Sequence, residues 1–206
     1  MKGYYFITDS NLSRAGNAKD VLCAVACGVE VVQYRNKNAE SRMMYEEAVR
    51  LREICSEALF LINDRVDIAL AIEADGVHLG QEDIPCIVAR KMLGPGKIIG
   101  ITVHNLAEAK EAETSGADYL GVSPIFQTKT KLDAGKPAGI ALIEEIRKQV
   151  SIPLIAIGGI NHSNATEVIQ AGADGLCAIS CVVAKENVDD EIKKFQKLFK
   201  EHRKGD

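Results

Sequence analysis

The chain has 206 residues, of which 47% are hydrophobic, and its formal net charge is −4 at pH 7. This length and apolar content suffice to bury a full core, so we expect one domain spanning residues 1–206. The acidic balance disfavours a nucleic acid or an anionic membrane as partner, so a bound anion must be small and held by locally clustered cations.

Residues 1–9 predict a strand and lack the profile of a signal peptide. No apolar run is long enough to cross a bilayer, and we therefore expect a cytoplasmic protein with no membrane partner. Cysteines occur at positions 23, 27, 55, 86, 177 and 181, scattered through apolar segments. That distribution favours reduced core thiols over a disulfide framework, and no pair has the spacing of a zinc or redox site.

Apolar runs of strand length alternate with amphipathic segments of helix length eight times along the chain. Repeated βα units place parallel strands in one sheet, and eight of them predict an α/β fold, a (β/α)8 TIM barrel. Helices are predicted at 106–115 after a capping Asn105, at 161–171 and at 191–204. The predicted strands are Tyr4–Thr8, Val29–Tyr34, Phe60–Asn63, Gly76–Leu79, Ile98–Val103, Tyr119–Ser123, Leu154–Ile157 and Gly175–Ile179.

An acid recurs just before or at the start of several predicted strands, usually after a glycine or alanine. A glycine there can end the preceding helix in the left-handed conformation. The acids are Glu30, Asp75, Asp118 and Asp174. They enter the barrel at the end opposite the catalytic face, so we expect structural roles for them.

The carboxyl ends of all barrel strands meet at one face, where polar residues far apart in sequence come together. The second strand ends in Gln33-Tyr34-Arg35-Asn36-Lys37. Gln33, Arg35 and Lys37 alternate and point to one side while the chain stays extended. They would bring one amide and two cations to the mouth; the alternative is an alternating charged strand edge.

Acids follow the third and fourth strands, in Asn63-Asp64 and in Glu82-Asp83. Two carboxylates on neighbouring loops can hold Mg²⁺, which prefers one or two carboxylates, waters and phosphate oxygens. We expect Asp64 and Asp83 to be the ligands, with Glu82 as the rival for the second position. The alternative is that each acid caps the helix that follows it.

Thr102 and His104 lie at the end of the fifth strand, and the sixth leads into the polar stretch 121–133. Of the four histidines, His104 is the one considered for ligand contact, and His78 is expected to be a hydrogen-bonded core or supporting residue. The hydroxyls and cations of 121–133 suit an anion, although a solvated surface loop would have a similar composition. They are Thr128, Lys129, Thr130 and Lys131.

Glycines follow the seventh strand and expose backbone amides, at Gly158 and Gly159. The eighth strand leads into Ile179 and Ser180. Loops after the seventh and eighth strands, with a helix N-terminus, are the usual phosphate site of such barrels. A glycine pair alone is weak evidence, because tight turns use it constantly.

Together these motifs resemble the thiamine-phosphate synthase family over essentially the whole chain. The segments that carry the resemblance are 33–37 (QYRNK), 61–65 (LINDR), 75–83 (DGVHLGQED), 121–134 (GVSPIFQTKTKLDA) and 156–160 (AIGGI). The resemblance implies a transferase that joins a hydroxymethylpyrimidine pyrophosphate to a thiazole phosphate, or its carboxylated tautomer. The products would be thiamine monophosphate and pyrophosphate, and Mg²⁺ would be the cofactor.

The resemblance also implies roles for individual residues. Those expected to contact the pyrimidine pyrophosphate are Gln33, Arg35, Lys37, Asn63 and Lys131, of which Arg35, Lys37 and Lys131 would be catalytic through charge stabilisation. Those expected to hold the thiazole phosphate are Thr128, Thr130, Gly159, Ile179 and Ser180. Asp64 and Asp83 would bind the metal. Tyr34, Asn36, Thr102 and Lys129 complete the predicted substrate-binding set.

Three positions depart from the family pattern. Thr102 stands where the family usually has serine, Ser123 replaces a common glycine, and Gln127 a common proline. The alternatives to a synthase are a thiazole tautomerase of the same superfamily, which needs no metal-bound pyrophosphate, and a non-catalytic barrel that binds thiamine phosphates. The sequence leaves the oligomeric state open, a homo-oligomer included.

Overall fold

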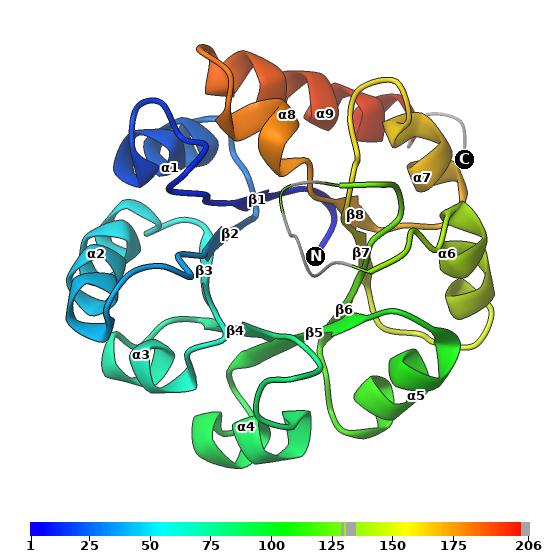
Figure 1. Cartoon of the computed structure of the whole chain (residues 1–206), viewed down its shortest axis with the longest axis horizontal. Coiled ribbons are helices and arrows are strands. Elements are labelled where there is room, and N and C mark those ends of the chain that lie inside the picture. The colour runs from blue at the N-terminus through cyan, green and yellow to red at the C-terminus, as the bar shows by residue number, and fades with distance from the viewer. Residues whose placement is uncertain (129, 131–134, 203–206) are drawn as a thin grey trace.

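The strands of the computed structural model close into one parallel barrel in the order β1 to β8, with the helices outside it (Figure 1). The structure describes residues 1–128, 130 and 135–202. Each strand pairs with its neighbours in the chain, and β1 pairs with β8 to close the ring. The predicted TIM barrel is therefore confirmed.

The strand boundaries agree with the prediction at β4 and β5 and within two residues at most others. The strands are β1 (Gly3–Ile7), β2 (Val31–Tyr34), β3 (Leu59–Asn63), β4 (Gly76–Leu79), β5 (Ile98–Val103), β6 (Tyr119–Val122), β7 (Leu154–Ala156) and β8 (Gly175–Leu176). The expected eighth strand, Gly175–Ile179, is too long, because the chain leaves the sheet after Leu176 and enters a helix at Ile179.

Helices follow every strand and alternate with them along the chain. They are α1 (Asn17–Ala26), α2 (Ser41–Ile54), α3 (Val66–Ala71), α4 (Cys86–Leu93), α5 (Leu106–Thr114), α6 (Ile140–Arg147), α7 (Ala165–Gln170), α8 (Ile179–Val183) and α9 (Val188–His202). Asn105 caps α5 as predicted, since its side chain accepts a hydrogen bond from the Glu108 amide. The helix predicted at 161–171 begins later, at Ala165, because a turn occupies its first residues.

Two hydrophobic clusters form the core in the described part of the chain. The larger one lies between the strands and the surrounding helices, and the smaller one includes Tyr5, Leu61, Tyr119 and Cys177. Bulky members of the smaller cluster need room made by glycines on neighbouring strands: a Cβ on Gly100 would lie 2.0 Å from the Tyr119 ring. Gly100 on β5 thus lets Tyr119 of β6 lie in the barrel interior.

Three acids clamp pairs of neighbouring strands, each in the same way. Asp75 accepts hydrogen bonds from the Phe60 amide and from Arg52 of α2. Asp118 does the same with the Ile99 amide and Arg90 of α4, and Asp174 with the Leu154 amide and Arg147 of α6. The structural roles expected for these acids are therefore observed at the amino ends of the strands.

Glu30 accepts a hydrogen bond from the Lys2 amide and lies 3.5 Å from the N-terminal ammonium group. It too therefore has a structural contact near the start of β1. Among the helices described, none has the length and apolar character that a membrane span requires.

Candidate active site

A cavity with about 880 Å³ of empty volume, open solvent included, lies at the carboxyl ends of the strands. Most of the residues that line it were predicted as site residues from the sequence. These are Gln33, Arg35, Lys37, Asn63, Asp64, Asp83, Thr102, Thr128, Thr130, Gly159, Ile179 and Ser180. The structure thus brings together residues from seven of the eight βα units, as a barrel mouth requires.

Two cations enter the cavity from the end of β2, each with an acidic partner. Lys37 Nζ lies 3.3 Å from Asp64 Oδ2, and Arg35 Nη1 lies 3.8 Å from Asp9 Oδ2. The Arg35 backbone is fixed as well, since its amide donates to Thr8 Oγ1 at 2.9 Å. Asp9 is buried, so the guanidinium is held against an acid with little competition from water.

Two carboxylates, Asp64 and Asp83, lie together beside Lys37. Burial raises the pKa of Asp64, the neighbouring Asp83 carboxylate raises it further, and the Lys37 ammonium lowers it. The backbone of Asp64 is left-handed, with φ of 62°, and its amide donates to the His78 carbonyl. Desolvation, like-charge proximity and an uncommon backbone conformation coincide at this residue, which is typical of functional sites.

Neither acid caps the helix that follows it. Asp83 Oδ2 accepts a hydrogen bond from the Gly80 amide at 2.7 Å, within its own loop. The N-caps of α3 and α4 are Arg65 and Pro85, and neither helix has a side-chain cap. The alternative that the two acids are helix caps is therefore wrong. Glu82, the rival ligand, is exposed and does not line the cavity.

A chain of hydrogen bonds crosses the barrel interior and joins three residues that line the cavity, Gln33, His78 and Thr102. Gln33 Nε2 donates to the Tyr5 hydroxyl at 2.8 Å, which bonds the Tyr119 hydroxyl at 2.7 Å. Tyr119 bonds His78 Nδ1, and His78 Nε2 bonds Thr102 Oγ1, both at 2.8 Å. Burial raises the pKa of both tyrosines well above the ordinary range, so they stay neutral hydroxyls. These hydrogen bonds fix the orientation of the Gln33 amide and the Thr102 hydroxyl at the floor of the cavity.

The glycine pair after β7 is required by its own backbone and by the loop after β6. Gly158 and Gly159 have φ of 101° and 65°, where side chains other than glycine are rarely found. A Cβ on Gly159 would lie 2.5 Å from the Gln127 carbonyl oxygen. The Phe126 amide donates to the Gly158 carbonyl, which ties the two loops together. Backbone, rather than side chains, therefore forms this wall of the cavity.

Two of the predicted substrate-binding residues do not line the cavity. Tyr34 is fully buried on the outer side of β2, and its hydroxyl donates to Glu47 of α2 at 2.5 Å. Side chains alternate along a strand, so Tyr34 faces outward when Gln33 and Arg35 face inward. Asn36 accepts a hydrogen bond from the Asn38 amide in the following turn. The expectation for these two side chains is therefore not supported by their positions.

His104 does not line the cavity, although it is the histidine that the sequence offered for ligand contact. Its Nδ1 is hydrogen-bonded to the Ser123 carbonyl oxygen at 2.6 Å, and its amide to Glu108. His78 lines the cavity instead, while also supporting Thr102. The predicted supporting role of His78 agrees with these hydrogen bonds.

Two predicted lysines, Lys129 and Lys131, lie outside the described residues, as does Asp133. Thr128 and Thr130 of the same loop are described and line the cavity. The sequence also missed Asp9, although the pair Thr8-Asp9 at the end of the first strand carried the same polar signal as the other strand ends. Apolar lining residues such as Ile157 and Cys177 carried no chemical signal.

Comparison with known proteins finds the same family that the sequence motifs resemble. Residues 4–182 match the family model described as thiamine monophosphate synthase. A thiamine-phosphate synthase of Methanosarcina mazei is 51% identical over 199 residues, which cover 96% of this chain and 83% of that protein. One from Chloroflexus aurantiacus is 48% identical and covers 94% of this chain and 91% of that protein.

The structure of this chain is also similar to solved structures. A thiamine phosphate pyrophosphorylase from Pyrococcus furiosus superimposes with a TM-score of 0.89 at 43% identity, covering 97% of this chain and 96% of that one. A 3-hexulose-6-phosphate synthase aligns with a TM-score of 0.70 at 16% identity, which reflects the barrel fold alone.

Proposed function

The chain belongs to the thiamine-phosphate synthase family of enzymes in thiamine biosynthesis, and we propose that it joins a hydroxymethylpyrimidine pyrophosphate to a thiazole phosphate. The observation that carries the proposal is the division of the cavity. Two carboxylates and two cations lie together on the β2 to β4 side, and hydroxyls with glycine backbone lie on the β6 to β8 side. The first group suits a pyrophosphate with its metal, and the second suits a monophosphate.

The donors at Asp64 and Asp83 fit Mg²⁺, which prefers hard oxygen ligands and keeps several waters. Burial raises the pKa of Asp64 and the adjacent Asp83 carboxylate raises it further, and a bound divalent cation would offset the negative charge of both acids. We propose that these two acids hold Mg²⁺. Bound there, the ion would offset negative charge that grows on the departing pyrophosphate.

Arg35 and Lys37 supply fixed positive charge for the same leaving group. Arg35 is held by Asp9 and Thr8, so little reorganisation is needed when charge develops. Lys37 reaches Asp64 and can bond a phosphate oxygen beside the metal ligands. Lys131, from the loop after β6, is proposed as the third cation of the set.

Gln33 would orient the pyrimidine. Its Nε2 donates to the Tyr5 hydroxyl, which leaves the amide oxygen as an acceptor for a ligand amino group. Departure of pyrophosphate leaves a pyrimidine-methyl cation, and the thiazole nitrogen captures it through its lone pair. No protein base is needed for this substitution, so positioning and charge stabilisation provide most of the rate.

The thiazole phosphate would lie against Thr128, Thr130, Gly159 and Ser180. Hydroxyls and backbone N–H groups at the start of a short helix after β8 are suitable donors for a phosphate. The loops after β6 and β7 hydrogen-bond each other, so this side of the cavity is held as one wall.

The test is to mix the purified protein with both substrates and Mg²⁺ and to measure pyrophosphate and thiamine monophosphate together. We expect equal amounts of both products, and none when either substrate is omitted. A tautomerase would instead convert the carboxylated thiazole alone and would be unaffected by a chelator. Binding of both substrates without turnover would indicate a non-catalytic barrel and would reject the proposal.

A further inference from the structure

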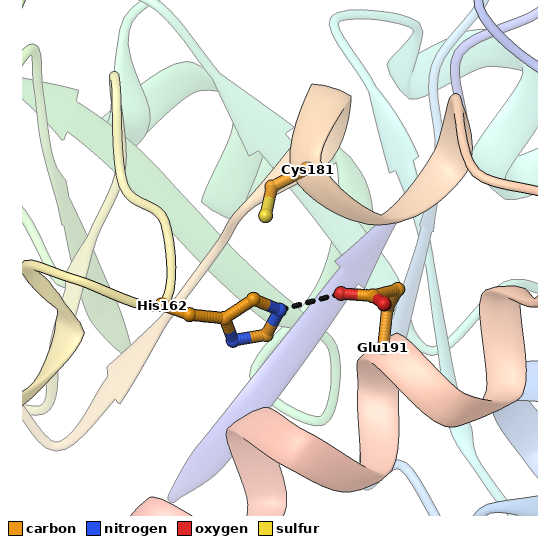
Figure 2. A group of neighbouring side chains, drawn as sticks. All are labelled: His162, Cys181 and Glu191. Atoms are coloured by element: carbon orange, nitrogen blue, oxygen red, sulfur yellow. Dashed lines mark hydrogen bonds and ion pairs between the residues drawn. The ribbon is translucent and has the colours of Figure 1, made fainter.

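Three side chains with metal-ligating atoms meet outside the cavity. They lie close to the cavity wall formed by the backbone of Gly158 and Gly159, called the glycine wall below. His162 comes from the loop after β7, Cys181 from α8 and Glu191 from α9 (Figure 2). One ligand atom of each lies within 4.8 Å of the other two, and all three residues are half-buried. His162 Nε2 and Glu191 Oε2 are 2.5 Å apart, and Figure 2 shows the Cys181 sulfur facing this pair.

We propose that His162, Cys181 and Glu191 form a binding site for a divalent transition-metal ion of the Zn²⁺ class. An imidazole, a thiolate and a carboxylate are the ligand types of tetrahedral zinc sites, whereas Mg²⁺ and Ca²⁺ take oxygen ligands. Three protein ligands leave the fourth position to water. The site is independent of the proposed function, because none of the three residues lines the cavity.

The geometry needs only small movements to accept the ion. Bonds of 2.0–2.3 Å in a tetrahedron place ligand atoms about 3.3–3.8 Å apart. The His162–Glu191 pair, 2.5 Å apart, must therefore open by about 1 Å, and the sulfur, which lies within 4.8 Å of both atoms, must approach by at most about 1.5 Å. The ion would replace the proton that imidazole and carboxylate share.

Neighbouring groups already fix the ligands in the way that supports metal binding. The His162 ring stacks on Phe195, with centroids 4.1 Å apart, and the second Glu191 oxygen accepts a hydrogen bond from Lys194 at 2.6 Å. Burial raises the pKa of the Cys181 thiol, and the backbone N–H of His162, which points at the sulfur, partly offsets that rise. Such supporting contacts orient ligands and raise affinity for the metal.

Binding there would fasten three elements around the proposed thiazole phosphate site. His162 lies three residues after Gly159, and Cys181 directly follows Ser180. A bound ion would join the loop after β7, α8 and α9, and so would hold the glycine wall against the start of α8. We therefore expect the bound ion to stabilise the fold, since it binds the folded chain, whereas the unfolded chain offers no preformed site.

The test is a titration of the full chain with Co²⁺, a spectroscopic substitute for Zn²⁺, with excess Mg²⁺ and a non-thiol reductant present. We expect a thiolate-to-cobalt charge-transfer band that saturates at one equivalent, and that Zn²⁺ displaces. Cys181→Ser should remove the band, whereas Cys23→Ser, the matched control at a half-buried cysteine of α1, should keep it.

Glu191→Gln keeps the shape of the side chain and should weaken Co²⁺ binding at least about tenfold, which keeps the test usable if Cys181→Ser misfolds. Asp83→Asn should retain the band, which separates this site from the proposed Mg²⁺ site. No band in the unsubstituted protein, a band that survives Cys181→Ser, or unchanged affinity in Glu191→Gln would each overturn the proposal.

Discussion

Asp64 combines the most unfavourable features of any residue in the candidate site. Its φ of 62° is uncommon outside glycine, its carboxyl is largely buried, and a second carboxyl lies beside it. Together these features cost the folded state free energy that Lys37 only partly offsets. A residue kept at such a cost is expected to act in function rather than in stability.

Asp64→Asn should therefore raise stability while removing activity. The folded-state pKa of Asp64 lies above its unfolded value, so the wild type loses stability as pH rises through the interval between them. Asn carries no such cost, so the gain should be near zero below about pH 4 and largest at neutral pH. Each kcal/mol gained corresponds to about 2–4 °C in Tm for a chain of this size.

Thermal unfolding of both proteins across pH, without divalent cations, checks this expectation. Asn also tolerates the left-handed backbone better than Asp, but that benefit does not depend on pH. The half-exposed Lys37 loses little with its partner. A gain of equal size at pH 3 and pH 7 would contradict the role assigned to charge.

Tyr119→Phe should break the hydrogen-bond chain below the cavity. Removing this hydroxyl leaves Tyr5 and His78 each without one buried hydrogen-bond partner. The expected loss is about 1–3 kcal/mol in the free energy of unfolding, measured by denaturant titration. Tyr45→Phe, at an exposed position of α2, is the matched control and should change stability by less than about 0.5 kcal/mol. Equal effects of the two substitutions would refute the structural importance of the chain.

The side chains around the cavity were predictable where strand periodicity applies. Alternation placed Gln33, Arg35 and Lys37 on one face, and the same rule excludes Tyr34, which the family motif had included. The hydrogen-bond chain through Tyr5 and Tyr119 was not predictable, because its members lie on non-adjacent strands and each reads as an ordinary core aromatic. Only the closed barrel brings them into contact.

Pairs of strands are joined at the amino end of the barrel by a repeated arginine–aspartate interaction. In each repeat an arginine of one helix holds an aspartate that accepts the amide at the start of a strand. The repeats occur at every second βα unit, through α2, α4 and α6. They lie at the end opposite the cavity, and we expect them to affect stability without affecting substrate binding.

Asp174→Ala should reveal this separation. The substitution removes an acceptor shared by Arg147 and the Leu154 amide, with an expected cost of about 1–3 kcal/mol in the free energy of unfolding. Glu57→Ala, at an exposed turn position, is the control and should be nearly neutral. Unfolding titrations and steady-state assays on the same samples check both halves. A raised KM with unchanged stability would contradict the structural role assigned to Asp174.

Strand and helix boundaries were best predicted where apolar runs end in turn residues. The limits of β4 and β5 agree with the sequence to the residue, because polar residues or glycine flank them. The end of β8 was not predictable in this way, since the apolar run 175–179 continues from strand into helix. Hydrophobicity alone cannot separate two buried elements joined without a break.

For the whole molecule, eight alternating units predicted the closed barrel, and the barrel then predicted that the strand ends converge. The cluster of His162, Cys181 and Glu191 was not predictable, because only the folded chain brings its members together. Its members are 10 to 29 residues apart and come from a loop and two helices, so no metal-binding spacing appears in the sequence. Docking of the last helices onto the barrel creates it.

The role of Mg²⁺ and Asp83 in catalysis is tested most directly by the rate of pyrophosphate release as a function of Mg²⁺ concentration, for the wild type and two neighbouring variants. Asp83→Asn removes an acid that lines the cavity, and Glu82→Gln removes the adjacent exposed acid. We predict that Asp83→Asn lowers kcat/KM about 100-fold or more and raises the Mg²⁺ requirement. Glu82→Gln should stay within about twofold, as expected for a surface substitution. Equal losses in the two variants would contradict the role of Asp83 as a Mg²⁺ ligand. Turnover of the wild type at full rate without a divalent cation would contradict the requirement for Mg²⁺.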